Sequence, residues 1–267
     1  MARKLRLDLY LVTKGFVESR HKAQQLIRAG MVRTAHGQLL DKPGYEISEG
    51  LEIKLKNSPK FVSRGGEKLI AAFKTFSLNV ERRVCLDCGI STGGFTDCLL
   101  QKGASRIYGI DVGYGQTAWS LRNDSRVTLK ERTNIRYLTS EMLYEPIDPR
   151  PNFLVADLSF ISLSLVIPSM TKLLDQANRE AVLLVKPQFE VGRENVGKGG
   201  VVRDIESHLN ALNKVISSSI AEKWTPKGLI SSPIKGPAGN HEYLLWLGTG
   251  EGNKLSNLRD LVENTLR

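Results

Sequence analysis

A short stretch in the first half of the chain has the residue types of a cofactor-binding turn. Strand-forming residues 84–86 are followed by Asp87, by small residues at positions 89, 91, 93 and 94, and then by an amphipathic helix. Residues with little or no side chain let backbone N–H groups approach a bound ligand closely. The spacing Asp87-x-Gly89-x-Ser91-x-Gly93 differs from the G-x-G-x-x-G pattern of dinucleotide sites. The stretch predicts a nucleotide-like cofactor without specifying which one.

A second carboxylate narrows the choice of cofactor. Asp111 comes near the end of the next apolar segment, residues 106–112, and a carboxylate there can accept hydrogen bonds from both hydroxyls of a ribose. Asp87 beside the turn could hold a cationic or amino group, whereas it would repel a pyrophosphate. These features favour S-adenosylmethionine over NAD. The two carboxylates could instead cap turns or helices, and the residues alone do not decide between these two interpretations.

The elements that position these residues alternate between strands and helices. We expect strands at 84–88, 106–112, 127–130, 153–157 and 181–186, with helices at 95–102, through Trp119, at 163–174 with a kink or break at Pro168, and at 205–223. This alternation predicts a mostly parallel sheet with helices on both faces and ligands at the carboxyl ends of its strands. Residues 228–230 and 243–247 would add an antiparallel pair, and a short helix at 255–266 would end the chain.

Two charged residues and one loop stand at the ends of these strands. Asp157 and Lys186 each end an apolar strand, where an unpaired charge is costly to bury, so we expect them to pair. The glycine-rich stretch 190–203 is predicted to be a long loop, either a substrate lid or a solvated connection.

We predict that the first 58 residues form a separate small module. A helix should begin at the N-cap Ser19 and stop at Gly30, followed by short strands at 31–33, 39–40 and 51–55. Residues 1–60 hold twelve Lys and Arg against six Asp and Glu, which is six of the ten net positive charges of the chain. The asymmetry favours a nucleic-acid-binding arm. Its phosphate contacts would come from one face carrying Arg20, Lys22, Arg28 and Arg33.

The polar run 57–60 leads into a linker at 59–63, and residues 64–267 form the second domain, with Lys68 in the first turn of a helix from Glu67.

The chain is 267 residues long, 41% hydrophobic and 25% charged, as expected of a soluble globular protein. Its longest apolar stretch, 158–170, contains four serines and Pro168, so we expect no membrane span. The first residues lack the apolar core of a signal peptide, so we expect a cytoplasmic protein. The Cys85-x-x-Cys88 pair lacks a second Cys/His pair, which favours packing over a metal or redox site.

The N-terminal module resembles the small RNA-binding module named after small-subunit ribosomal protein four. The resemblance lies in residues 6–11, 19–23 and 27–30 and in Val32. It implies binding to structured RNA, adds Arg6 to the expected contacts, and says nothing about chemistry.

Nearly the whole chain resembles the TlyA family of ribosomal RNA 2′-O-methyltransferases, historically also called haemolysins. The matching segments are 62–66 with Lys68, 85–87, 91–96, 111–116, 118–124, 131–134, 155–162, 185–190, 239–240 and 242–243. The resemblance implies a Rossmann-like class I methyltransferase fold of the FtsJ-like type, S-adenosylmethionine as cofactor, and cytidine targets in RNA of the small subunit or of both subunits. It also implies cofactor contacts from Thr92, Gly94, Phe95 and Asn134, and an RNA contact from Arg64.

The FtsJ-like active site is a Lys-Asp-Lys-Glu tetrad, which the resemblance assigns here to Lys68, Asp157, Lys186 and Glu242. We expect Lys186 to take or share the ribose 2′-OH proton, or to stabilise the developing alkoxide, with Asp157 orienting it. Glu242 would hold Lys68 and the ribose. The main alternative is a non-enzymatic RNA-binding ribosome assembly factor, against which the complete tetrad argues. A pore-forming haemolysin and a pseudouridine synthase are less consistent with the sequence.

Overall fold

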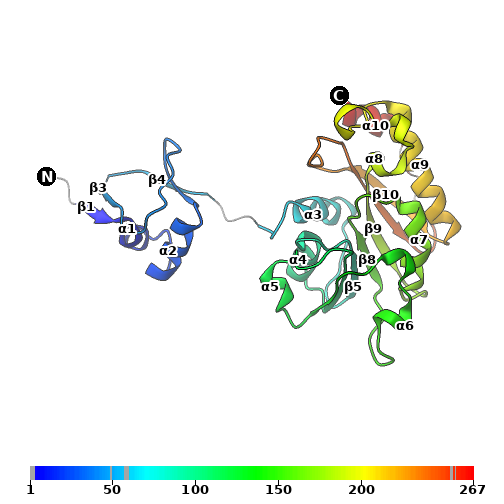
Figure 1. Ribbon diagram of the computed structural model, residues 1–267, viewed down its shortest axis with the longest axis horizontal. Coiled ribbons are helices and arrows are strands. Elements are labelled where there is room, and N and C mark those ends of the chain that lie inside the picture. The colour runs from blue at the N-terminus through cyan, green and yellow to red at the C-terminus, as the bar shows by residue number, and fades with distance from the viewer. Residues whose placement is uncertain (1–3, 49, 57–59, 253–254, 256) are drawn as a thin grey trace. The chain divides into compact units, whose positions relative to one another are not determined.

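The computed structural model describes residues 4–48, 50–56, 60–252, 255 and 257–267. The chain forms two compact units, residues 1–60 and 61–267. The division falls inside the expected linker 59–63, while residues 57–59 of the polar run lie outside the described residues. Figure 1 shows the helices and strands of both units.

The N-terminal unit packs two helices against two small antiparallel sheets. Its elements are β1 (Lys4–Arg6), α1 (Leu7–Thr13), α2 (Arg20–Arg28), β2 (Val32–Thr34), β3 (Glu46–Ser48) and β4 (Ile53–Leu55), with β1 paired to β3 and β2 to β4. Ser19 caps α2 by accepting a hydrogen bond from the Lys22 N–H, as predicted. The strand expected at 39–40 is wrong, because only an isolated bridge joins Leu39 to Arg33. The core is built on fully buried side chains of both helices, among them Leu7, Leu11 and Ile27.

The second unit is a seven-stranded sheet in the order β10-β11-β9-β8-β5-β6-β7. Its strands are β5 (Val84–Cys88), β6 (Arg106–Ile110), β7 (Val127–Lys130), β8 (Phe153–Ala156), β9 (Glu180–Val185), β10 (Thr225–Ser231) and β11 (Tyr243–Gly248). Strands β5 to β9 run parallel, whereas β11 is antiparallel to both β9 and β10. The expected parallel sheet with an added antiparallel pair is therefore confirmed.

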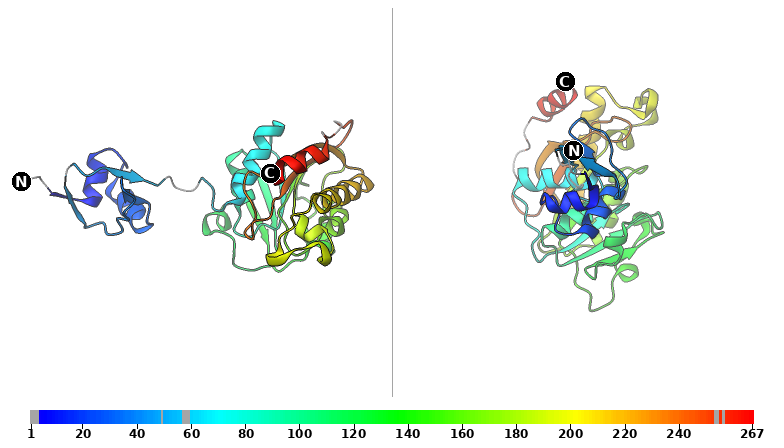
Figure 2. Two further views of the ribbon diagram at one scale, coloured as in Figure 1. Left: turned by 90° about the horizontal axis from the view of Figure 1, so that it is seen from above. Right: turned by 90° about the vertical axis from the view of Figure 1, so that its left-hand side faces the viewer.

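Helices cover both faces of this sheet (Figure 1). One face carries α3 (Gly65–Phe76), α4 (Gly94–Gln101) and α5 (Trp119–Arg122), and the other carries α7 (Leu163–Lys172), α9 (Ile205–Ala221) and α10 (Leu258–Leu266). Figure 2 shows α10 (red) beside α9 (yellow to orange), with which it is in contact. Short helical turns lie at α6 (Ser140–Leu143), α8 (Pro187–Glu190) and η1, η2 and η3 (Ile135–Tyr137, Arg193–Asn195 and Lys198–Gly200).

Alternate residues of each strand enter the two cores. Cys85 packs with the α3 and α4 side, and its neighbour Leu86 packs with the α7 and α9 side. All three cysteines are buried and none forms a disulfide in the described part of the chain, and burial raises the pKa of the Cys85 thiol to about 12, consistent with the expected packing role. We expected a kink or a break at Pro168; helix α7 continues through this residue to Lys172, so the break does not occur.

The reversed strand β11 brings a distant residue to the edge where the parallel strands end. Tyr243 pairs with Val185, the last residue of β9. The residues immediately outside these two strands, Glu242 and Lys186, therefore lie at the same edge. Within the described ranges, no helix is both long and apolar enough to cross a membrane.

Candidate active site

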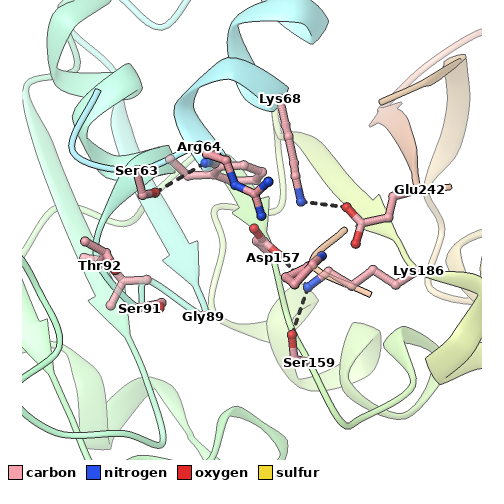
Figure 3. A pocket seen from close by; sticks show the side chains of 15 residues that line it. Ser63, Arg64, Lys68, Gly89, Ser91, Thr92, Asp157, Ser159, Lys186 and Glu242 are labelled. Carbon is pink, nitrogen blue, oxygen red and sulfur yellow. Dashed lines mark hydrogen bonds and ion pairs between the residues drawn. The ribbon is translucent and has the colours of Figure 1, made fainter. Parts of the chain in front are cut away.

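A cavity of about 280 Å³ lies at the carboxyl edge of the sheet (Figure 3). It brings together two features that are separate in the sequence, the glycine turn after β5 and all four residues of the expected tetrad. Its lining is formed by Ser63, Arg64, Gly65, Lys68, Gly89, Ile90, Ser91, Thr92, Gly94, Phe95, Asp157, Ser159, Lys186, Pro237 and Glu242.

The first tetrad pair joins α3 to the start of β11. Lys68 Nζ lies 2.6 Å from Glu242 Oε2, and both side chains are buried. A buried charge needs a partner, so each residue accounts for the burial of the other. The second oxygen of Glu242, Oε1, is also buried and has no hydrogen-bond partner within the described part of the chain. Glu242 lines the cavity, and its Oε1 lies on the side of Gly236.

The second pair joins the ends of β8 and β9. Lys186 Nζ lies 2.7 Å from Asp157 Oδ1 and donates to Ser159 Oγ at 2.9 Å (Figure 3). A lysine ammonium has three N–H donors. Two are committed to this short loop, which fixes the nitrogen at the cavity wall and leaves one donor for a ligand. Sequence reasoning missed Ser159, whose only local signal is its position two residues after Asp157.

The glycine turn is tightly constrained on the cavity side. Gly89 and Gly93 have φ of +87° and +102°, in the region that favours glycine. A Cβ atom at Gly89 would lie 2.6 Å from the backbone oxygen of Asp157, and one at Gly94 would lie 2.2 Å from Ser63 Oγ. The turn therefore approaches both the tetrad and the start of α3 as closely as backbone atoms allow. Gly89, Ser91, Thr92, Gly94 and Phe95 line the cavity as expected, and Gly93 does not.

Asp87 is not positioned as the expected ligand of an amino group. Its side chain is fully buried, and Oδ2 accepts a hydrogen bond from Thr96 Oγ1 at 2.7 Å. Burial raises the pKa of this carboxyl to about 7. Asp87 does not line the cavity. Its hydrogen bond with Thr96 connects the end of β5 to α4, the two elements that flank the turn.

Asp111 and Asn134 are also absent from the cavity lining. Asp111 accepts the N–H groups of Ser91 and Gly113, both at 2.7 Å, and thereby ties the glycine turn to the loop after β6. Each carboxylate oxygen keeps a further lone pair, so a ribose remains chemically possible. Asn134 caps η1 by accepting a hydrogen bond from the Arg136 N–H.

A buried carboxylate that sequence reasoning missed joins the two segments bearing Asp157 and Lys186. Glu190, at the end of α8, accepts hydrogen bonds from Ser162 Oγ and, at 2.7 Å, from the Leu163 N–H. Further along, Asn240 accepts the Val202 N–H and donates to the Gly200 carbonyl. The loop 190–203 is thus attached at both of its ends.

The expected RNA contacts divide between the two units. Arg64 lines the cavity, next to the tetrad. Lys22, Arg28 and Arg33 are exposed on the N-terminal unit. Arg6 and Arg20, also in that unit, both bind Asp8.

A mainly parallel sheet with one reversed strand, a glycine turn after β5 and two lysine–carboxylate pairs at one edge define a Rossmann-like methyltransferase. Residues 61–249 match the FtsJ-like methyltransferase family, and residues 5–53 match the S4 domain. The chain belongs to the TlyA family within this class.

Three relatives show the extent of the similarity. The 16S/23S rRNA (cytidine-2′-O)-methyltransferase TlyA of Mycobacterium tuberculosis is 45% identical over 100% of this chain and 98% of its own. A Bacillus subtilis protein described as an rRNA methyltransferase, YqxC, is 48% identical over 95% of this chain and 90% of its own. A solved structure from Streptococcus thermophilus, described as a hemolysin, has a TM-score of 0.72 and 38% identity, covering 99% of this chain and 96% of that one.

Proposed function

We propose that this protein transfers a methyl group from S-adenosylmethionine to the ribose 2′-hydroxyl of a cytidine in ribosomal RNA. The observation that carries the proposal is the complete tetrad in the cavity that the glycine turn also lines. The S4 domain supports an RNA substrate, and the M. tuberculosis relative supports cytidine in small- and large-subunit RNA. We infer that the protein works in the cytoplasm, because its relatives modify ribosomal RNA.

The cavity suits S-adenosylmethionine on steric and chemical grounds. Gly89 and Gly94 pack directly against Asp157 and Ser63, so the backbone of the turn, free of side chains at these two positions, forms part of the cavity wall. The carboxylate of Asp157 lies at the same wall and suits a positively charged sulfonium. When bound, this cofactor supplies the methyl group, and the protein must activate the hydroxyl.

The tetrad provides the groups for that activation. A ribose hydroxyl is a poor nucleophile until its proton begins to leave. Lys186, fixed by Asp157 and Ser159, stands where its remaining donor can stabilise the developing alkoxide or, as the free amine, take the proton. Glu242 holds Lys68 at the cavity wall, and the pair would orient the ribose there.

The direct test is methyl transfer with purified protein, isotopically labelled S-adenosylmethionine, and either free ribosomal RNA or isolated subunits. We expect one or more 2′-O-methylcytidines, located by mass spectrometry of nuclease fragments. RNA binding without methyl transfer on any of these substrates would instead favour an assembly factor.

The glycine turn yields a prediction for cofactor binding. Gly89→Ala should weaken S-adenosylmethionine affinity about tenfold or more, because a side chain at φ +87° costs about 1–3 kcal/mol and meets the Asp157 backbone. Titration calorimetry measures the loss. Gly103→Ala is the matched control, since Gly103 has the same φ of +87° in the α4–β6 turn. The control should lower stability and leave cofactor affinity unchanged. Equal effects on affinity would contradict the role of the turn.

An exposed aromatic residue beside the tetrad predicts an RNA contact. Phe160 directly follows Ser159, is 91% exposed, has φ of +65°, and contacts Phe189 with ring centroids 5.2 Å apart. A strained, exposed aromatic directly after a residue of the cavity wall suits stacking on a nucleotide base, worth about 1–3 kcal/mol. Phe160→Ala should lower kcat/KM for RNA about tenfold to a hundredfold, with unchanged cofactor affinity, whereas Phe160→Tyr should retain it. Ile147→Ala, at a site 94% exposed, is the control. Unchanged kcat/KM in Phe160→Ala would exclude the contact.

A further inference from the structure

The N-terminal unit contains a buried carboxylate that binds two exposed arginines. Asp8 is fully buried, yet its oxygens accept hydrogen bonds from Arg6 Nε at 3.1 Å and Nη2 at 3.0 Å, and from Arg20 Nε at 3.0 Å. Gln24 Nε2 donates to it at 3.0 Å, and the Leu9 N–H at 2.9 Å. The hydrogen bonds from Arg6 above all hold the pKa of the Asp8 carboxyl well below its usual range. Asp8 is therefore a charged anchor at neutral pH.

This anchor brings together residues from two different elements. Arg6 ends β1 and Arg20 begins α2, and their side chains are 44% and 52% exposed. Arg20 uses only Nε towards Asp8. Among the described residues, no acceptor lies within hydrogen-bonding distance of the two terminal nitrogens of Arg20. Asp8 therefore fixes both guanidinium groups from the protein side, and each group keeps N–H donors that face solvent. The two positive charges exceed the single buried negative charge, so the site is positive overall.

We propose that Arg6 and Arg20 form a preorganised binding site for an RNA backbone phosphate, with Asp8 as its positioning residue. A planar guanidinium matches phosphate oxygens with paired N–H donors. Arginine side chains lose conformational freedom when they bind, and a carboxylate that already holds both Nε groups reduces that loss. The proposal rests on the proposed function for the identity of the ligand as ribosomal RNA.

The proposal makes a prediction opposite to that of simple charge counting. Removing a negative charge from a basic surface should tighten RNA binding if only long-range attraction mattered. If Asp8 positions the arginines, Asp8→Asn should weaken binding of the full-length protein to purified 16S and 23S ribosomal RNA about fivefold to tenfold at 0.15 M salt. Asp41→Asn, a change at an exposed carboxylate of the same unit, is the control and should leave affinity unchanged or slightly higher.

Two further measurements separate positioning from general damage to the fold. Asp8→Asn placed in an Arg6→Ala/Arg20→Ala background should cause no further loss, because the groups that it positions are gone. The charge-preserving double variant Arg6→Lys/Arg20→Lys should bind RNA as weakly as Asp8→Asn, since lysine cannot keep one nitrogen on Asp8 and present a fork outward. This variant keeps the proposal testable if Asp8→Asn does not fold, as judged by circular dichroism and thermal melting.

The wild-type protein decides between failure of this proposal and failure of the proposed function. Wild-type protein that neither binds nor methylates ribosomal RNA would overturn the proposed function. Wild-type binding that is matched or exceeded by folded Asp8→Asn or by Arg6→Lys/Arg20→Lys would overturn the positioning role of Asp8 alone.

Discussion

Replacing Lys186 by alanine should lower the rate of methyl transfer about a hundredfold to ten-thousandfold, the range for loss of a positioned proton-transfer group. The reason is that Lys186 is fixed by Asp157 and Ser159 at the cavity wall, so that its remaining donor or lone pair serves the ribose oxygen. S-adenosylmethionine affinity should change little, because the glycine turn is a separate part of the cavity wall. Single-turnover transfer of a labelled methyl group, with titration calorimetry in parallel, measures both quantities.

Two controls make the Lys186 result specific. Lys172→Ala removes an exposed lysine at the end of α7, outside the cavity lining, and should leave the rate unchanged. Ser159→Ala should give an intermediate loss, because it frees Lys186 on one side only. Full turnover by Lys186→Ala would refute the proposed chemistry, even if the protein is a methyltransferase.

The Lys68–Glu242 pair should affect stability and catalysis separately. Glu242→Leu alone leaves the buried Lys68 charge without its partner and should destabilise the protein by about 3–5 kcal/mol. The double variant Lys68→Met/Glu242→Leu removes both charges and should recover most of that loss, since a buried ion pair can be replaced by apolar residues of similar volume. It should nevertheless remain inactive, because the cavity wall loses the charged groups of both Lys68 and Glu242.

Urea unfolding and the methyl-transfer assay, applied to the single and double variants, separate the two roles. Recovered stability without activity is the expected result. Recovered activity in the double variant would show that the pair serves only the fold. A double variant as unstable as Glu242→Leu would instead contradict the view that unpaired charge causes the loss.

Features with a local cause were predictable from the sequence. The alternation of apolar strands and helices predicts the sheet and its two helical layers. Asp157 and Lys186 each lie at the end of an apolar strand, where a charged residue needs a partner, so their pairing was also predictable. The family resemblance supplied Lys68 and Glu242, which lie 174 residues apart and have no local signal of their own.

Features that depend on packing between distant segments were not predictable. Asp87 precedes a glycine turn, as a ligand would, but α4 packs over it and buries it against Thr96. Glu190 appears in the sequence as part of a polar loop, and its role depends on Ser162, which only the tertiary fold brings near. The contacts of Asp8 with Arg6 and Arg20 likewise need α1, which carries Asp8, to pack against α2.

Because Glu242 comes directly before the reversed strand β11, it is the last of the four tetrad residues to be synthesised. The cofactor turn, Lys68, Asp157 and Lys186 all precede residue 187, whereas Glu242 comes directly before β11, the last strand to leave the ribosome. A nascent chain that has not reached residue 242 lacks Glu242 and all of β11, the strand that lies between β9 and β10 in the sheet. The Lys68–Glu242 contact is therefore the last part of the tetrad that can form as the chain is made, after the methyl-donor turn and the Asp157–Lys186 pair.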